Sequence, residues 1–161
     1  MTIKAQIAGL HAGIEAFAAC VASLSEELFV RKCNGWSPRD IVAHLIGWNR
    51  YIIKGSTQIK NGELPFYDLD PGENYSKVNA VLIRVYSSND KQELLKELQD
   101  SVRELEEFLQ SLPPKEWDHD YGVRHRGVPI TIRNSVDEVI EDYAHHKEQI
   151  ENWVNRSGRA F

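Results

Sequence analysis

Hydrophobic positions near the start of the chain recur at alternating intervals of four and three residues. They are Ile3, Ile7, Leu10, Ile14, Phe17, Val21, Leu24 and Leu28. This spacing places all eight side chains on one face of an α-helix and predicts one amphipathic helix over the stretch. Gln6, His11 and Glu15 interrupt its alanine-rich part, and no stretch reaches the ~18 apolar residues of a membrane span. We therefore expect neither a secretory signal nor a membrane helix.

A second helix is predicted to begin at Ser37 and to stop near Gly55. Ser37 can accept hydrogen bonds from the first free amides, Pro38 suits the first helical position, and Asp40 favours the positive end of the helix. The apolar positions that follow are Ile41, Val42, Leu45, Ile46, Trp48, Ile52 and Ile53. Residues 60–74 carry two glycines and two prolines, so a loop is expected there.

A third helical segment is expected to begin near Tyr75. Residues 87–90, Ser-Ser-Asn-Asp, interrupt its apolar pattern, which resumes at Leu94 and ends at the two prolines of residues 113–114.

The stretch from residue 115 to residue 134 has no clear period. We expect a short β-hairpin within it, around Tyr121 to Ile132. The last helix is expected to start at a capping box over residues 135–138, Ser-Val-Asp-Glu. Its apolar stripe comprises Val136, Val139, Ile140, Tyr143, Ile150, Trp153 and Val154.

Four amphipathic helices predict an all-α fold, a four-helix bundle forming one domain over residues 1–161. The connection between the second and third helices has about 15 residues. At ~3.3 Å per extended residue, it can cross the whole length of a ~30 Å helix. These two helices can therefore lie parallel, an arrangement that short loops would forbid.

Composition and missing motifs exclude several classes of function. Charged residues make up 27% of the chain and hydrophobic residues 42%, which is typical of a globular protein and not of a disordered or disulfide-rich one. The net charge of −5 offers no basic surface for phosphates, so nucleic acid is not an expected partner. Cys20 and Cys33 form no CxxC pair, which favours a reducing, cytoplasmic setting. The absence of G-x-S-x-G, P-loop and G-x-G-x-x-G sequences argues against serine-elbow hydrolases and Rossmann enzymes.

Three polar residues occupy helix faces that should be buried. His44 lies in line with the apolar stripe of the second helix, and Asp142 and His146 share one face of the last helix. An unpartnered buried carboxylate costs several kcal/mol, and a divalent metal would relieve that cost for all three groups together. Two histidines and one carboxylate suit Ni²⁺, Zn²⁺ or, less well, Fe²⁺. The alternative is an ordinary hydrogen-bonded Asp–His pair beside a core histidine.

Four more residues are candidates for contact with a small-molecule ligand. His119 and His125 belong to the irregular segment, which could cover a site in the bundle or simply be solvated. Trp48 and Tyr143 could line the pocket, although the tryptophans, Trp36 and Trp153 included, are expected mainly to pack.

Two motifs resemble a known family. Residues 35–48, Gly-Trp-Ser-Pro-Arg-Asp-Ile-Val-Ala-His-Leu-Ile-Gly-Trp, resemble the second-helix signature of the DinB-like (damage-inducible, YfiT-like) superfamily, and residues 142–150 resemble its fourth-helix motif. The resemblance implies a bundle with a long second crossover, often a homodimer. In many members it implies a divalent metal, frequently nickel or zinc, held by three histidines. Here the ligands would be His44, His146 and, in place of the expected third histidine, Asp142.

The resemblance implies three functional alternatives. The first is a metal-dependent enzyme, either a hydrolase or a transferase of low-molecular-weight thiols to small electrophiles. The second is a metal-free protein that binds a small toxic compound and protects the cell, as in the related branch similar to colibactin self-protection proteins, which lacks the histidine triad. The third is a dimer-forming stress protein without a ligand.

Overall fold

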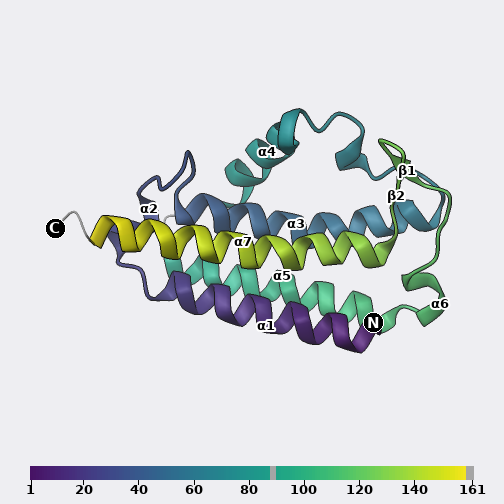
Figure 1. The fold of residues 1–161 in the computed structure, drawn as a ribbon, viewed down its shortest axis with the longest axis horizontal. Helices are drawn as coiled ribbons and strands as arrows, with labels where there is room; N and C mark the ends of the chain where they lie inside the picture. Colours follow the sequence, from purple (N-terminus) through teal and green to yellow (C-terminus); the bar gives the residue numbers. More distant parts are fainter. Residues whose placement is uncertain (88–89, 159–161) are drawn as a thin grey trace.

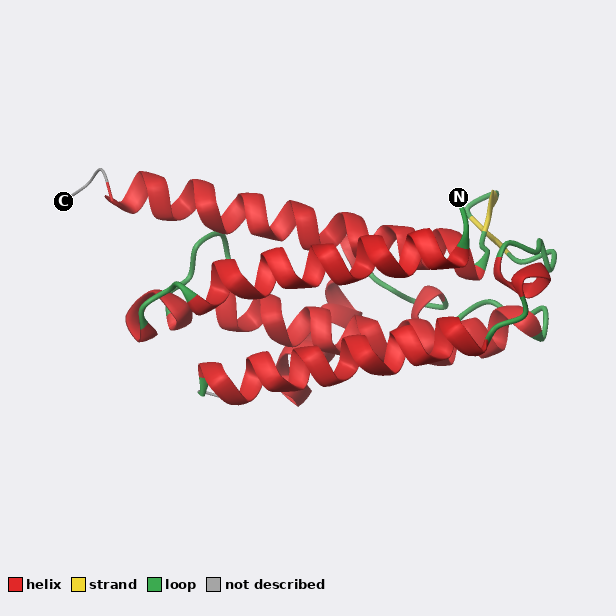
Figure 2. Ribbon diagram, turned by 90° about the horizontal axis from the view of Figure 1, so that it is seen from below, coloured by secondary structure: helices red, strands yellow, loops and turns green. Residues whose placement is uncertain are grey.

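The computed structural model describes residues 1–87 and 90–158. Four long helices lie side by side, and a small hairpin caps one end of the molecule (Figures 1 and 2). The long helices are α1 (Ile3–Ala22), α3 (Pro38–Lys60), α5 (Lys91–Ser111) and α7 (Ile132–Gly158). The shorter elements are α2 (Glu26–Val30), the 3₁₀ turns η1 (Phe66–Asp68) and η2 (Glu73–Tyr75), α4 (Ser76–Tyr86), α6 (Pro114–Trp117), and the antiparallel strands β1 (Arg124–His125) and β2 (Val128–Pro129). The predicted all-α class and the hairpin are confirmed.

Helices α3 and α5 run in the same direction, whereas α1 and α7 run in the opposite one (Figure 1). The connection from residue 61 to residue 90 makes this possible, because it returns along the bundle and carries α4, which packs on α3. Helix α3 also contacts α5 and α7, and α1 contacts the same two helices. The predicted long crossover is therefore present.

The first helix is shorter than its apolar pattern predicts. Helix α1 ends at Ala22, and the hydroxyl of Ser23 donates to the carbonyl of Cys20. Ser25 then caps α2, which carries Leu28. The turn leaves the spacing of the apolar residues nearly intact, which is why the pattern does not reveal the break.

Helix α3 does not stop near Gly55, as predicted, but continues to Lys60. Gly55 is needed inside the helix because a Cβ atom there would lie 2.6 Å from Cε1 of Tyr67, a residue of the crossover. Asn61 caps the helix after Lys60, and Gly62 follows with a φ of +76°. At the other end, the predicted cap is confirmed: Ser37 and Asp40 form a capping box with each other's backbone.

Helix α7 begins at Ile132 rather than at the predicted cap, Ser135. The hydroxyl of Thr131 accepts from the amide of Asn134, and the side chain of Asn134 accepts from the amide of Thr131. This pairing caps the helix one turn earlier, and Ser135 donates its hydroxyl to the Thr131 carbonyl. Two capping patterns overlap in the sequence, and the chain uses the first. The predicted break between the third-segment helices lies at residues 87–90, of which 88–89 fall outside the described residues.

Within the described ranges, α1 is the one helix whose length and apolar composition would allow it to cross a membrane. Core helices and signal sequences near an N-terminus share these properties. In the bundle, α1 buries one stripe of side chains against α5 and α7, namely Gln6, Leu10, Ile14, Phe17 and Val21.

Candidate metal centre

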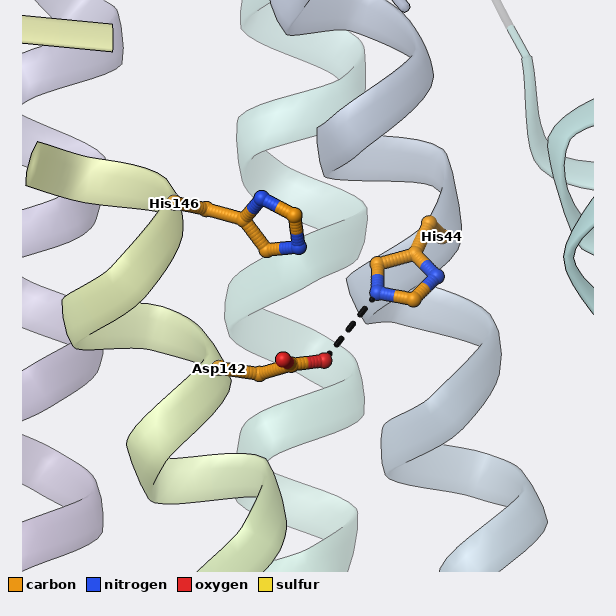
Figure 3. Close-up of side chains that lie close together, drawn as sticks. All are labelled: His44, Asp142 and His146. Carbon is orange, nitrogen blue, oxygen red and sulfur yellow. Dashed lines mark hydrogen bonds and ion pairs between the residues drawn. The ribbon is translucent and has the colours of Figure 1, made fainter. Parts of the chain in front are cut away.

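The three polar residues on the buried helix faces converge. His44 projects from α3, Asp142 and His146 project from α7, and all three point toward one another (Figure 3). Each offers one ligand atom, and these atoms lie within 4.8 Å of one another. Two ligand atoms on one ion with ~2.1 Å bonds are at most ~4.2 Å apart. That limit applies to ligands on opposite sides of an ion; tetrahedral ligands lie ~3.4 Å apart, so the most widely spaced pair must approach by up to about 1.4 Å for all three to share an ion.

Asn79 of α4 determines which nitrogen of His44 carries the proton. Its Oδ1 atom lies 2.8 Å from Nδ1 of His44 and 2.8 Å from Nε1 of Trp48. The indole of Trp48 can only donate, so this atom of Asn79 is an acceptor and His44 must donate through Nδ1–H. The lone pair of a neutral His44 is then on Nε2, 3.2 Å from Oδ2 of Asp142. Two acceptors at this distance repel each other unless a proton or a metal cation lies between them.

His146 is held in a matching way. Its Nδ1 atom lies 3.0 Å from Oε1 of Gln149, one helical turn along α7. A metal-binding histidine typically donates its other N–H to an oxygen, which fixes the ring and leaves the remaining nitrogen for the ion. Both imidazoles therefore have the support that ligands need, and Nε2 of each is the nitrogen available for an ion.

The electrostatics of the cluster favour the protonation states in which side chains bind a metal ion. His44 and His146 are only 4% and 8% exposed, and Asp142 is partly exposed. Desolvation and the neighbouring His44 lower the pKa of His146, which keeps it neutral at pH 7. Desolvation pushes the pKa of Asp142 upward, but the hydrogen bond and charge of His44, together with His146, outweigh it and leave the pKa below its usual value. An ionised Asp142 and a neutral His146 are the forms that bind a divalent transition metal.

The cluster opens into a cavity of about 960 Å³. Helices α3 and α7 form its floor, and the crossover and the hairpin segment supply the remaining walls. Among the predicted ligand-contact residues, Trp48 and His125 line this cavity. The volume is within the range of small-molecule sites.

Two predicted contact residues lie elsewhere. Tyr143 is fully buried in the bundle core, where its hydroxyl accepts a hydrogen bond from Asn49 and its ring packs edge-on against Phe17. It follows Asp142 directly and so points about 100° away from it around the helix. His119 is exposed before the hairpin, with its ring against Tyr121, and does not line the cavity.

Sequence reasoning missed several residues that the structure brings to the site. Asn79 is buried on the apolar side of α4, so a polar residue in line with Leu82 was the available indication. Trp36, predicted to pack, lines the cavity with its ring centroid 5.1 Å from that of His44. Asp68 and Tyr75 also line it, from turns whose position no periodicity predicts.

The chain was compared with protein families and with solved structures. A family model described as the DinB superfamily matches residues 10–150. No curated protein sequence matches. An uncharacterized protein from Clostridium difficile 630 shares the fold with a TM-score of 0.79 and 13% identity, over 96% of both chains.

Two solved structures with informative names also share the fold. The colibactin self-resistance protein ClbS, solved in complex with a dsDNA, has a TM-score of 0.76 and 14% identity, with 94% of both chains covered. The mycothiol-dependent maleylpyruvate isomerase has a TM-score of 0.73 and 13% identity, over 93% of this chain and 61% of that one. At these identities the likeness shows the fold alone.

The prediction that excludes nucleic acid as a partner is wrong. It depended on the net charge of −5, yet ClbS, with the same fold, is solved with double-stranded DNA. Net charge is a sum over the whole surface, whereas binding depends on the local surface that meets the ligand.

Proposed function

This chain belongs to the DinB superfamily, and on that premise we propose that it is a divalent-metal-dependent enzyme acting on a small molecule. The reaction is hydrolysis or the transfer of a low-molecular-weight thiol to a small electrophile. The observation that carries the proposal is the convergence of His44, Asp142 and His146 at a cavity of small-molecule size. The thiol alternative has further support from the fold shared with a mycothiol-dependent isomerase.

The residues of the chain have distinct roles in this proposal. His44, Asp142 and His146 would hold Zn²⁺ or Ni²⁺, which when bound lowers the pKa of a water or thiol and polarises a substrate. Asn79 and Gln149 orient the two imidazoles. Trp36 and Trp48 line the cavity beside the His44 ring, with ring centroids 5.1 and 6.4 Å from it.

The test is the metal content of protein purified without a histidine tag. We expect about one equivalent of zinc or nickel, and its loss in His44→Ala, because this variant removes one of the three side chains that would bind the ion. His11→Ala is the matched control, since His11 is exposed on α1. A metal content below about a tenth of an equivalent per chain, together with an unchanged melting temperature in a chelator, would refute the proposal.

A second candidate function is metal-free binding that protects against a toxic small molecule. It is favoured by the fold shared with a self-resistance protein and by the contact between His44 and Asp142, which a protonated His44 would satisfy without a metal. Metal-free protein with full ligand affinity would support this candidate. Because ClbS is solved with dsDNA, a mobility shift with duplex DNA that survives moderate salt would add DNA as a ligand.

We also propose that the chain forms a homodimer and works in a reducing, cytoplasmic setting. The family resemblance supports the first, and the unpaired state of Cys20 and Cys33 is compatible with the second. Light scattering on the purified protein measures the oligomeric state directly.

A further inference from the structure

A second group of polar side chains lines the same cavity on its hairpin side. Asp68 belongs to η1 and is only 6% exposed. Its Oδ1 atom accepts a hydrogen bond of 2.6 Å from the hydroxyl of Tyr75 and lies 3.4 Å from Nδ1 of His125. These three residues come from η1, η2 and β1, so the fold assembles them from separate segments. None of them has a role in holding the metal.

Glu138 lies between this group and the metal donors. It precedes Asp142 by one turn of α7, lines the cavity and is exposed to it. It has no hydrogen-bond or ion-pair partner among the described residues. Desolvation and the negative charges of Asp68, Glu141 and Asp142 raise its pKa. Among the described residues that line the cavity, the carboxylates of Asp68, Glu138 and Asp142 repel one another and face four imidazoles and one guanidinium, that of Arg126 on the exposed hairpin turn.

Tyr67 supports this wall, with its hydroxyl packed toward Gly55 of α3. Tyr67 lines the cavity and is 6% exposed, and its hydroxyl is buried near Ser135 without a well-formed hydrogen bond. Buried polar groups are nearly always hydrogen-bonded, and exceptions occur at functional sites. Its ring packs edge-on against Trp48, whose ring also meets that of Tyr75.

The backbone that presents Tyr75 is strained. Asn74 and Tyr75 adopt consecutive left-handed conformations, with φ of 51° and 60°. Non-glycine residues rarely adopt this region, and such strain concentrates at ligand sites. Here it places the Tyr75 hydroxyl on Asp68 and the Tyr75 ring beside Trp48.

From this wall we propose that the hairpin side of the cavity binds the ammonium group of a small organic amine. The carboxylates of Asp68 and Glu138 supply the opposite charge, and the rings of Trp48 and Tyr75 supply faces that attract a cation. The inference deepens the proposed function by naming its substrate class, and rests on it for the chemistry at the metal end.

The test uses three probes of the same shape and different charge: 2-phenylethylamine, 2-phenylethanol and phenylacetate. Titration calorimetry on chelator-treated protein excludes coordination of the amine to a metal. We expect the amine to bind about tenfold more tightly than the alcohol, the ratio that a difference of ~1.4 kcal/mol produces, and the carboxylate not to bind. Glu138→Gln should remove most of this preference. Glu148→Gln is the matched control, because Glu148 is exposed on the same helix and does not line the cavity.

Two outcomes overturn the inference: an amine that binds no better than the alcohol, or a preference that both glutamine variants change equally. Metal loading of the same preparations tests the proposed function alone. Amine binding by a protein that takes up no metal would refute the proposed function and support the inference. Metal uptake by a protein without a preference for the amine would support the proposed function and refute the inference.

Discussion

Asn79 fixes the tautomer of His44, because its Oδ1 atom accepts the Nδ1–H of His44 and leaves Nε2 facing Asp142. The acceptor comes from α4, an element of the crossover, whereas the histidine comes from α3. The orientation of a metal ligand in the bundle thus depends on how the crossover docks against it.

We expect Asn79→Leu to lower zinc affinity about 10–100-fold, the usual cost of removing the oxygen that orients a ligating histidine. Competition with a chromogenic chelator measures the affinity. Asn152→Leu, at an exposed position of α7, is the control. Equal affinities for the two variants would show that Asn79 does not orient the ligand.

Gly47→Ala should disturb the contact between Asn79 and His44 from the α3 side of the interface with α4. A Cβ atom at Gly47 would overlap the buried side chain of Leu82 on α4. Although alanine favours helices over glycine, overpacking costs about 1–3 kcal/mol, so we expect lower stability in urea and weaker zinc binding. Gly9→Ala is the control: its Cβ would meet Ile140 at an ordinary 3.9 Å, and it should stabilise the protein by about 0.5–1 kcal/mol.

The stability contribution of Glu138 should depend on pH. Desolvation and neighbouring carboxylates raise its pKa in the folded state, so the folded protein binds this proton more tightly than the unfolded chain. Its favourable contribution is complete below the unfolded pKa of ~4.3 and is lost as the pH rises through the folded pKa. Glu138→Gln should therefore melt higher than the wild type at pH 7 and lose that advantage near pH 4. An advantage that grows toward acid would contradict this sign.

Gln6 joins three helices through a buried network. Its side chain accepts from Nε1 of Trp117 and donates to the Arg133 carbonyl and to Asp137, at 2.7, 2.8 and 2.9 Å. Gln6→Leu leaves buried partners unsatisfied and should lower the free energy of unfolding by about 1–3 kcal/mol without changing zinc affinity. Denaturant unfolding measures the effect, and Gln99→Leu at an exposed position of α5 should change little.

Periodicity predicted the features that depend on local spacing. The bundle class, the crossover and the capping box at Ser37 follow from residues close in sequence. So does the shared face of Asp142 and His146, and the apolar stripe around His44 then made their convergence predictable.

Other features depend on contacts that the sequence does not show. The sequence predicts a helix end near Gly55, whereas the helix continues and needs this glycine, because Tyr67 approaches it in the folded protein. Gln6 interrupts the apolar run in the sequence, yet it is 1% exposed, because Trp117 and α7 form hydrogen bonds with its side chain. The positions of Asp68 and Tyr75 follow from the docking of the crossover, and the sequence around them has no hydrophobic periodicity that would predict it.

The division of the cavity between two kinds of structure has a consequence for redesign. The metal donors stand on α3 and α7, which also supply Trp48 and Glu138, whereas the rest of the cavity wall comes from residues 67–79 of the crossover and from the hairpin segment. A combinatorial library confined to the exposed cavity-facing positions of these two connections would vary ligand selectivity while the donor atoms and the interhelical packing stay constant.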